Sequence, residues 1–335
     1  MIPNQWYVIM ESSEVKPGHL VGVTRMGEKM VLWRDARGGV ACMADQCPHR
    51  GVALSAGKLL HDHVQCPFHG FEYDRSGRCV LVPANGRNTP VPKVLQVRRV
   101  YPTHEAHGFI YIWWGDSKAV DQLPPPPFFD SIDETQFSYL TLRDHWNTHY
   151  SRAIENQLDV VHLPFIHHNT IGRGNRTLVH GPLVRLVRME DNNELINLWV
   201  YNEIDHGQTP RRPSELPEPQ RHPSLQFLFP NLWQNWISDD IRIVIAFVPV
   251  DEENTLMYIR NYQRVLRLPV FRRLFDWVSL LGSFAIERQD RRVVVTQRPK
   301  RSDLYLGEKL IQGDTPIIVY RRRRREMIEN ATSPG

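Results

Sequence analysis

Short runs of alternating apolar and polar residues dominate the first third of the chain. Runs rich in β-branched and aromatic side chains occur at residues 6–10, 30–34, 40–43, 71–74, 97–101 and 109–114. Turn signals such as Gly38-Gly39 and Ser76-Gly77 separate several of them. Short segments of this composition between turns predict β-strands. We therefore expect residues 6 to 115 to form an all-β domain of small stacked sheets.

The second half of the chain mixes helical and strand patterns. Residues 152–162 contain neither Gly nor Pro and predict a helix, which Pro164 should end because its ring cannot continue the helical hydrogen bonds. Residues 241–248 and 255–260 flank a polar turn and predict a β-hairpin. A last helix is predicted between residues 268 and 298, where apolar positions recur at spacings of three and four. The residues expected on its buried face are Phe271, Leu274, Phe275, Val278, Leu281 and Ala285.

A proline-rich connector separates the two patterns. The four consecutive prolines at positions 124–127 predict a stiff, extended segment. We therefore expect an N-terminal domain over residues 1–117, a linker over 118–135, a larger C-terminal domain over 136–320 and a basic tail over 321–335. The tail begins with five consecutive arginines, and a solvated helix end is the simplest interpretation of such a charge run.

Composition places few constraints on function. The 335 residues suffice for two domains, and the 41% hydrophobic and 23% charged residues are ordinary for a soluble globular protein. A net charge of +4 indicates no particular partner. No apolar run approaches the ~18 residues of a membrane span, and the first residues lack the pattern of a secretory signal. With four cysteines and no convincing disulfide framework, we expect a reducing, cytoplasmic location.

Two short cysteine–histidine clusters carry the first candidate chemistry. Cys47 and His49 form one cluster, and Cys66 and His69 form the other after sixteen intervening residues; a proline follows each cysteine. Two thiolates and two imidazoles are the ligands of a Rieske [2Fe–2S] cluster, in which the thiolates hold one iron and the imidazoles the other. A structural zinc site is the alternative, but such sites usually pair Cys with Cys and His with His along the chain. The mixed clusters therefore favour the iron–sulfur centre.

A second candidate site involves histidines at the start of the C-terminal domain. His162 and His167 are five residues apart, so on an uninterrupted helix they would point about 140° apart. A break at Pro164 can bring them together. Two imidazoles and one carboxylate leave open positions on an iron, the arrangement of non-haem Fe(II) oxygenases. His145 and His149 are four residues apart and could share a helical face, which makes them rivals for the same role.

The order of these motifs resembles the Rieske non-haem iron oxygenases. The resemblance is carried by the two cysteine–histidine clusters and by the downstream run from Asp159 to His167, and it covers nearly the whole chain. It is strongest to the homotrimeric members, the group of dicamba demethylase, pheophorbide oxygenases and saxitoxin-pathway hydroxylases. It implies an α+β fold, in which an all-β Rieske [2Fe–2S] domain precedes a helix-grip-like (START/Bet v1-type) catalytic domain with an antiparallel sheet and a long C-terminal helix.

The resemblance also implies roles for individual residues. His162 and His167 would bind a mononuclear Fe(II). Asp159 would connect His162 with His69 of a neighbouring subunit, where a carboxylate orients the imidazoles and carries the electron path. Asn156, one helical turn before Asp159, corresponds to a family position close to the iron.

The third iron ligand implied by the resemblance is an acid on the last helix. Asp290 matches the expected spacing, because apolar residues follow it and Gln297 lies seven positions later. Glu287, one turn earlier, is the rival. Gln289 occupies a position where the family often has a second acid, which leaves the surroundings of the ligand less acidic.

These expectations combine into an O2-dependent oxygenase, and a monooxygenase acting on a small or mid-sized organic substrate is the preferred form. O- or N-demethylation and aromatic-ring dioxygenation are alternatives on the same scaffold, and a Rieske electron-transfer protein without oxygenase activity is a further one. No G-x-G-x-x-G motif follows a predicted strand, so we expect a separate NAD(P)H-dependent reductase or ferredoxin. The five arginines could dock such an acidic donor. We expect no nucleic acid partner.

Overall fold

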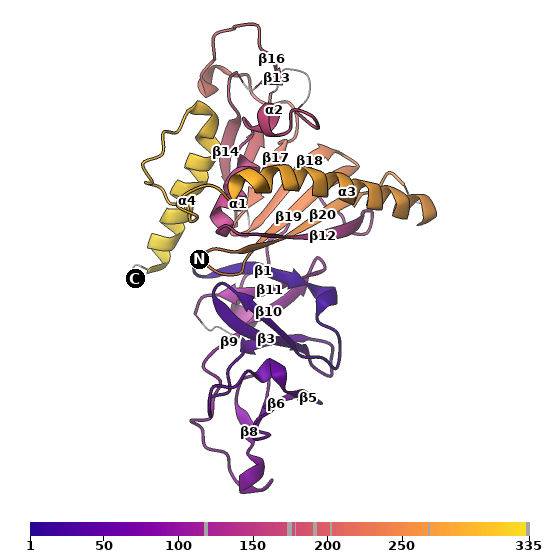
Figure 1. Cartoon of the computed structure of the whole chain (residues 1–335), viewed down its shortest axis with the longest axis vertical. Helices are drawn as coiled ribbons and strands as arrows, with labels where there is room; N and C mark the ends of the chain where they lie inside the picture. The colour runs from indigo at the N-terminus through magenta and orange to yellow at the C-terminus, as the bar shows by residue number, and fades with distance from the viewer. Residues whose placement is uncertain are drawn as a thin grey trace. The chain divides into compact units, whose positions relative to one another are not determined.

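A computed structural model of the chain describes residues 1–116, 120–172, 176–177, 179–189, 193–201, 203–266 and 269–332 (Figure 1). The chain divides into two compact units, one up to Pro126 and one from Pro127 onward. The change of unit falls inside the proline tract, whereas the expected boundary at residues 117 and 118 lies outside the described residues. None of the described helices is both long and apolar enough to cross a bilayer.

The first unit is built from three small antiparallel sheets. The first sheet has the order β1 (Gln5–Glu11), β11 (Phe109–Trp114) and β10 (Thr103–Ala106). The second has the order β2 (Val21–Arg25), β3 (Glu28–Arg34), β4 (Val40–Ala44) and β9 (Val100–Tyr101). The third has the order β5 (Lys58–Leu60), β6 (His63–Gln65), β7 (Glu72–Tyr73) and β8 (Cys79–Leu81). Short 3-10 helices lie at Ser12–Glu14, Leu54–Ala56, Pro83–Asn85 and Val120–Gln122.

One hydrophobic cluster joins the second and third sheets of this unit. Trp33 on β3, Met43 on β4 and Tyr73 on β7 are fully buried in it, together with the cysteines of the two candidate loops. Burial of large aromatic side chains contributes much of the stability of a small β domain. Because the cluster includes the loop cysteines, it also anchors the two loops. The all-β first domain expected from the alternating runs is confirmed.

The second unit contains a seven-stranded antiparallel sheet. Its strands, in spatial order, are β12 (Ser138–Trp146), β20 (Thr255–Gln263), β19 (Ile241–Pro249), β18 (Leu232–Ser238), β17 (Leu225–Leu228), β15 (Glu194–Trp199) and β14 (Leu183–Arg188). β19 and β20 pair in continuous register from Ile241 opposite Gln263 to Pro249 opposite Thr255, so the predicted hairpin is confirmed. A two-stranded pair, β13 (Arg176–Thr177) and β16 (Glu203–Ile204), lies apart from this sheet.

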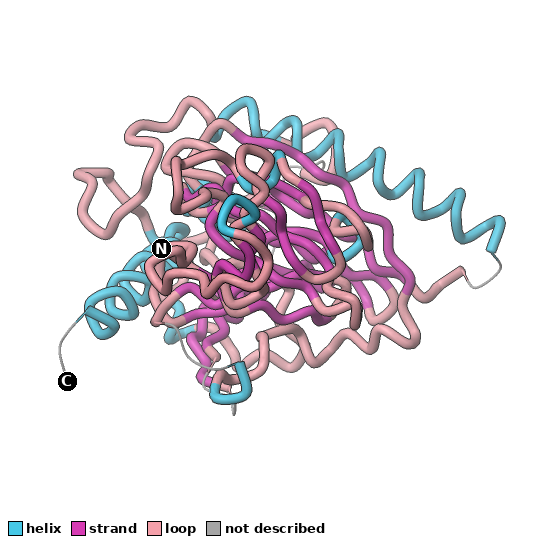
Figure 2. The backbone as a smooth tube through the Cα atoms, turned by 90° about the horizontal axis from the view of Figure 1, so that it is seen from below, coloured by secondary structure: helices cyan, strands magenta, loops and turns pink. Residues whose placement is uncertain are grey.

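Four helices accompany the sheet in the part of the second unit that the structure describes. They are α1 (Tyr150–Leu158), α2 (Leu163–Ile166), α3 (Pro269–Val294) and α4 (Thr315–Thr332), with 3-10 turns at Pro213–Glu215 and Gln312–Asp314. The long helix α3 runs across one face of the sheet and contacts β12 and β20 (Figure 1). Viewed at 90°, the same helix lies outside the layer of strands (Figure 2). This arrangement confirms the expected α+β class with a sheet and a long late helix in the second domain.

The buried face expected for α3 is wrong. Leu274, Val278 and Leu281 are 60%, 55% and 48% exposed, while the acids Asp276 and Glu287 on the same helix are buried. The side chain of Phe271 lies outside the described part. Helical spacing identifies an apolar stripe, but it does not say whether that stripe or the polar side faces the sheet. Here α3 turns acids toward the sheet, where the candidate site described below lies.

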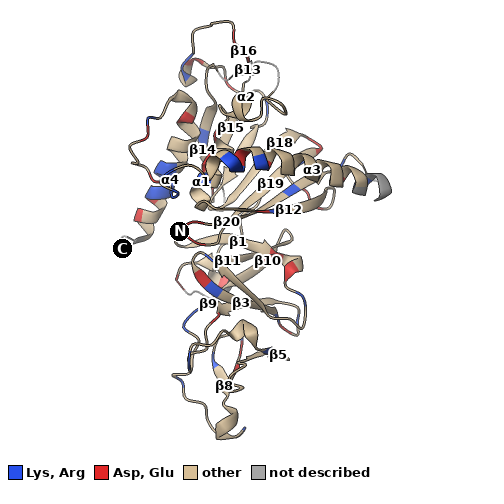
Figure 3. Ribbon diagram, viewed as in Figure 1, with Lys and Arg blue, Asp and Glu red and all other residues tan. Residues whose placement is uncertain are grey.

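The arginine run is not a solvated tail. It belongs to α4, whose basic residues are marked in blue in Figure 3, and Arg321 and Arg324 are only 3% and 4% exposed. Arg321 donates through Nε and Nη2 to the two oxygens of the buried Glu155 at 2.7 and 2.8 Å, and through Nη1 to Glu308 at 2.6 Å. Arg152 reaches the same two carboxylates at 3.1 and 2.9 Å. The solvated-end interpretation is therefore wrong for Arg321 and Arg324.

Arg321→Ala is expected to lower the free energy of unfolding of the second unit by about 3 kcal/mol, because a buried carboxylate then loses its bidentate partner. Chemical denaturation monitored in the second unit measures the effect. Arg325→Ala is the matched control on the same helix: Arg325 has a 43% exposed side chain paired with Glu329. That variant should cost less than about 0.5 kcal/mol. Equal losses in the two variants would contradict the structural role of Arg321.

Candidate metal centres

Two loops of the first unit repeat one backbone pattern around Cys47 and Cys66. The amide of Cys47 donates to Val52 O at 2.8 Å, and the amide of Gly51 donates back to Cys47 O at 2.8 Å. In the second loop the amide of Cys66 donates to Phe71 O at 2.8 Å, and the amide of Gly70 donates to Cys66 O at 3.1 Å. The two glycines have φ angles of +75° and +71°, a backbone conformation that L side chains rarely adopt. The matched loops therefore present two equivalent sets of side chains.

The side chains in these loops sort by type. Cys47 and Cys66 are buried at 2% and 3% exposure, and their thiols interact with each other. The rings of His49 and His69 are exposed, with centroids 4.7 Å apart. A pair of thiols beneath a pair of imidazoles is the division that a [2Fe–2S] cluster needs, with one iron for each pair. The residues present thus fit a Rieske cluster.

A single zinc ion fits this loop pair poorly. A tetrahedral zinc draws its four ligand atoms to within about 4 Å of one another, since Zn–S bonds are about 2.3 Å long. Across the described residues, Cys47, His49, Cys66 and His69 do not form a group of three or more with ligand atoms within 4.8 Å of one another. Two irons bridged by sulfides space the thiolates and imidazoles farther apart.

Burial changes the pKa values of the groups around the two cysteines. It raises the pKa of the Cys66 thiol, so metal binding must displace a proton there. The hydroxyl of Tyr73 lies 3.1 Å from Cys47 Sγ, and burial also raises the pKa of this hydroxyl. A protonated phenol can donate a hydrogen bond to a thiolate, which stabilises negative charge on sulfur. Sequence inspection had not singled out Tyr73, because nothing in the local pattern distinguishes it from a core aromatic.

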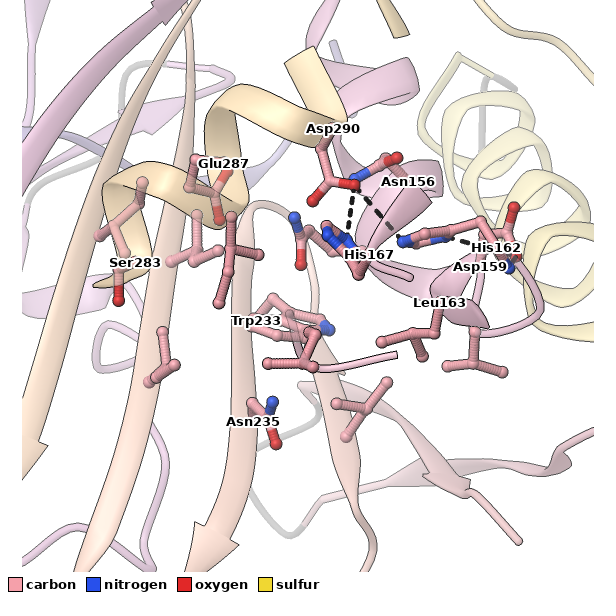
Figure 4. Close-up of a pocket in the computed structure, with 18 of the residues that line it drawn as sticks. Asn156, Asp159, His162, Leu163, His167, Trp233, Asn235, Ser283, Glu287 and Asp290 are labelled. Atoms are coloured by element: carbon pink, nitrogen blue, oxygen red, sulfur yellow. Dashed lines mark hydrogen bonds and ion pairs between the residues drawn. The ribbon is translucent and has the colours of Figure 1, made fainter. Parts of the chain in front are cut away.

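A second group of ligand-type side chains lies in the second unit. His162, His167 and Asp290 each offer a ligand atom, and these atoms lie within 4.8 Å of one another. Asp290 Oδ1 is 3.0 Å from His167 Nε2 and 3.4 Å from His162 Nε2 (Figure 4). The side chains of His167 and Asp290 are 2% and 4% exposed, and that of His162 is 14% exposed. Two imidazoles and one carboxylate converging on one point suit a mononuclear iron with open positions.

The chain reaches this arrangement by a break that differs from the expected one. Helix α1 ends at Leu158, and Asp159 Oδ1 accepts hydrogen bonds from the amides of Val161 and His162 at 2.9 and 3.3 Å. Pro164 does not end the helix as expected but lies in the first turn of α2, where its missing N–H needs no partner. The turn at Asp159 therefore changes the direction of the chain after α1, so that His162 and His167 face Asp290.

The rival histidine pair does not form a site. His145 lies on strand β12, whereas His149 precedes α1 and its Nδ1 accepts a hydrogen bond from the amide of Ser151 at 3.3 Å. Burial lowers the pKa of His149 to about 2, with further lowering by Arg324 and Arg301, so the ring is neutral. The two histidines therefore do not share a helical face, and that expectation is wrong.

Two of the expected site residues flank the histidine ligands. Asp159 Oδ1 lies 3.6 Å from His162 Nδ1, and the Asp159 side chain is 27% exposed (Figure 4). Asn156, one turn earlier on α1, is 9% exposed, and its Nδ2 has no hydrogen-bond partner among the described residues. At 3.6 Å Asp159 acts on the His162 ring as a nearby charge, since His162 Nδ1 has no hydrogen-bond partner among the described residues, and it remains open to a further group from outside.

Gln289 holds the other histidine. His167 Nδ1 lies 2.7 Å from Gln289 Oε1, which also accepts from Thr170 Oγ1 at 3.1 Å, while Gln289 Nε2 donates to Asn169 Oδ1 at 3.1 Å. Because an amide oxygen only accepts, Nδ1 carries the proton that bonds to Gln289, and Nε2, which lies 3.0 Å from Asp290 Oδ1, is the nitrogen left for a metal. Burial lowers the pKa of His167, but the hydrogen bonds to Asp290 and Gln289 outweigh it and raise the pKa overall. Sequence inspection noted Gln289 only as a missing acid.

Gln289→Leu is expected to weaken Fe(II) binding about 10- to 100-fold, because the His167 ring loses the group that fixes its tautomer and orientation. Competition with a coloured Fe(II) chelator measures this affinity. Gln289→Glu retains an acceptor at the same place and should bind iron at least as well as the natural protein. Unchanged affinity in the leucine variant would show that packing alone orients His167.

Glu287, the rival of Asp290, occupies a different place. It is 5% exposed and is not part of the three-residue ligand group. Burial raises its pKa well above the usual value, and the nearby Asp290 and Asp144 raise it further. This shift favours the protonated carboxyl of Glu287, a form that suits a hydrogen-bond donor better than a metal ligand.

A cavity of about 190 Å³ adjoins the three ligands. Figure 4 shows Glu287 and Ser283 on one side of it and His162 and Leu163 on the other. Ile171 and Ile237 line it and are 58% and 52% exposed, which places its opening beside them. The apolar wall includes Leu225, Trp233, Ile243, Ile245, Ile259 and Ile286. A concave, mostly apolar space beside perturbed polar groups is the usual form of a small-molecule site.

The sequences of both units match known domain families. The Rieske [2Fe–2S] domain matches residues 5–100, and the vanillate O-demethylase oxygenase C-terminal domain matches residues 146–330. The oxygenase component of dicamba O-demethylase from Stenotrophomonas maltophilia is 35% identical over 169 residues, which are 50% of this chain and 48% of that protein. Chlorophyllide a oxygenase of Chlamydomonas reinhardtii, a chloroplastic protein, is 32% identical over 202 residues, which are 60% of this chain and 29% of that protein. The chain thus spans less than half the length of these two relatives.

A solved structure shares the fold over nearly the whole chain. NdmA from Pseudomonas putida CBB5 superposes with a TM-score of 0.76 at 21% sequence identity, covering 97% of this chain and 90% of that one. The C-terminal domain family alone accounts for more than half of this sequence, and it follows a Rieske domain in the same order as the two candidate centres. The chain therefore belongs to the Rieske non-haem iron oxygenases, oxidoreductases that combine a [2Fe–2S] cluster with a mononuclear iron and O2.

Proposed function

We propose that the protein is a monooxygenase that inserts one atom of O2 into a small or mid-sized organic substrate. The observation that carries the proposal is the ligand group of His162, His167 and Asp290 at the wall of an apolar cavity. An iron bound there would activate O2, with one oxygen atom entering the substrate and the other leaving as water at the expense of two electrons and two protons. A protein that only transfers electrons would have no use for such a cavity.

The chain's own residues have separable tasks in this proposal. Cys47, His49, Cys66 and His69 would hold the [2Fe–2S] cluster. His162 and His167 would bind the mononuclear iron through neutral imidazoles, whose orientation is supported by Asp159 and Gln289. Asn156 offers an unpaired amide donor beside this centre, where it can position a substrate or a water. The isoleucine-rich wall would exclude bulk water from the reacting atoms.

We further propose that electrons cross between copies of the chain. Asp159 lies beside His162 and is partly exposed, and the His69 ring is exposed in its own unit. A homotrimer that brings His69 of one copy to Asp159 of the next would connect the two iron centres. A separate NAD(P)H-dependent reductase or ferredoxin would supply the electrons. Two of the four cysteines would bind iron and none of the four forms a disulfide among the described residues, so the protein suits a reducing compartment such as the cytoplasm.

Isotopically labelled O2 tests the proposed reaction. The reconstituted protein should contain about three irons per chain and consume O2 only with both a reductant system and a substrate. One labelled oxygen atom in the product is the expected result. Two labelled atoms would indicate a ring dioxygenase, and release of formaldehyde would indicate O- or N-demethylation. About two irons per chain without substrate-dependent O2 consumption would indicate an electron carrier.

A further inference from the structure

The cavity beside the three ligands contains buried polar atoms that nothing in the described chain satisfies. Glu287 Oε2, Trp233 Nε1 and Asn156 Nδ2 belong to residues that line it, and each lacks a hydrogen-bond partner among the described residues. His162 Nδ1 and Asp290 Oδ1, in the metal-ligand group, also lack one. Glu287, Trp233 and Asn156 are 5%, 4% and 9% exposed. Leaving such a group unpaired costs free energy, so three of them around one cavity indicate a ligand that completes them.

The three unpaired groups outside the metal-ligand group can donate hydrogen bonds. An indole N–H donates only, and the amide nitrogen of Asn156 is likewise a donor. Burial raises the pKa of Glu287, which favours the protonated carboxyl, the form that can donate a hydrogen bond. By contrast, the Ser283 hydroxyl on the same side is already engaged with the Asn261 side chain at 3.0 Å. The cavity therefore presents hydrogen-bond donors, and a ligand that satisfies them must carry hydrogen-bond acceptors.

The charge of the cavity wall narrows the ligand class further. Among the described residues that line the cavity there is neither Lys nor Arg, whereas Asp159 and Asp290 are both present. A carboxylate or sulfonate placed there would meet no cationic side chain from the described lining and would lie near existing negative charge. A neutral acceptor such as a carbonyl, an ether or a ring nitrogen avoids that cost. The volume of about 190 Å³ compares with the roughly 150 Å³ that admits benzene, so one substituted ring or two small fused rings would fit.

We propose that this cavity selects an uncharged, largely apolar ring compound bearing a hydrogen-bond acceptor, and that Glu287 and Trp233 recognise the acceptor. The proposal rests on the proposed function only in taking the cavity as the substrate site. Glu287 is then a specificity-determining residue rather than a spare ligand. Because Glu287 Oε2 has no partner among the described residues, a bound compound that lacks an acceptor would leave it unpaired.

Equilibrium dialysis with three matched probes tests the proposal without turnover. The probes are 1-indanone, indane and indane-1-carboxylate, which share one ring system and differ in having a neutral acceptor, none, or an anion. The metal-loaded, oxidised protein is used without reductant. We expect 1-indanone to bind about tenfold tighter than either of the other two, the value of one satisfied buried hydrogen bond.

Two substitutions at Glu287 connect the preference to the residue. Glu287→Leu should abolish the preference for 1-indanone over indane, whereas Glu287→Gln, which retains a donor, should preserve it. Because removing an unpaired buried carboxyl is neutral or stabilising, the leucine variant should melt at the same or a higher temperature. Glu218→Leu, at an acid with a 74% exposed side chain outside the cavity, is the matched control and should change no probe affinity.

The possible outcomes separate the two proposals. A preference for the anion, an unchanged ratio in Glu287→Leu, or no binding of any probe at millimolar concentration would overturn the selectivity proposal. A lower melting temperature of Glu287→Leu with an unchanged ratio would make Glu287 a structural residue. Failure of O2-dependent product formation, with the probe preference intact, would overturn the oxygenase proposal alone.

Discussion

Replacing Asp290 with alanine is expected to abolish mononuclear iron binding and substrate-dependent O2 consumption while preserving the visible spectrum of the Rieske cluster. Asp290 Oδ1 lies 3.0 and 3.4 Å from the Nε2 atoms of His167 and His162, so its removal leaves two neutral imidazoles to hold a dication. Two ligands without a carboxylate hold Fe(II) poorly. The cluster ligands belong to the other unit and are untouched. The measured iron content should therefore fall by about one iron per chain.

Glu287→Gln is the matched control for that experiment. Glu287 lies on the same helix one turn earlier and is also buried, but it is not part of the ligand group. Its amide variant should retain the full iron content. If Asp290→Ala kept its mononuclear iron and Glu287→Gln lost it, the carboxylate ligand would be Glu287 and the selectivity proposal would fail as well.

Replacing Asp159 with asparagine is expected to slow electron transfer to the mononuclear iron about 10- to 100-fold without loss of either metal centre. The Asp159 side-chain oxygen accepts from the amides of Val161 and His162, and an asparagine oxygen can accept the same two bonds. The local turn should therefore survive, whereas the negative charge on the proposed path between the two centres disappears. Reoxidation of the pre-reduced cluster by O2 and substrate, followed by stopped-flow absorbance, measures the rate.

Mixed oligomers test whether the path runs between copies. An Asp159→Asn chain keeps its own cluster, but its mononuclear iron can no longer receive electrons efficiently from a neighbour. A Cys66→Ser chain lacks the cluster but keeps Asp159 and the mononuclear site. Each variant alone should be inactive or slow. Co-expressed, a cluster of the first variant can supply the iron of the second, so turnover should return. No recovery in verified mixed oligomers would place the path within one chain.

The ligand types and their order were predictable because they depend on local chemistry. Paired Cys and His with adjacent prolines and glycines predict metal loops wherever they fold, since only certain residues bind iron or tolerate the turns. The alternating runs predicted the all-β first domain for a similar reason, because the period of two is a property of the strand itself. The placement of Asp290 on a late helix followed from a family resemblance rather than from the residues alone.

The tertiary structure decided which side of each element faces inward. The apolar stripe of α3 lies outside and its acids lie inside, and the five arginines of α4 include two buried ones that pair with distant acids. Neither result follows from spacing, because burial depends on what the rest of the chain places opposite a side chain. The same holds for two further residues of α3. Gln289 gains its partners His167, Thr170 and Asn169 only when α3 packs in the folded chain, and only that packing leaves Glu287 Oε2 without a partner among the described residues. Local residue chemistry thus determined what this protein can bind, and long-range packing, which no short segment encodes, determined where and beside which groups.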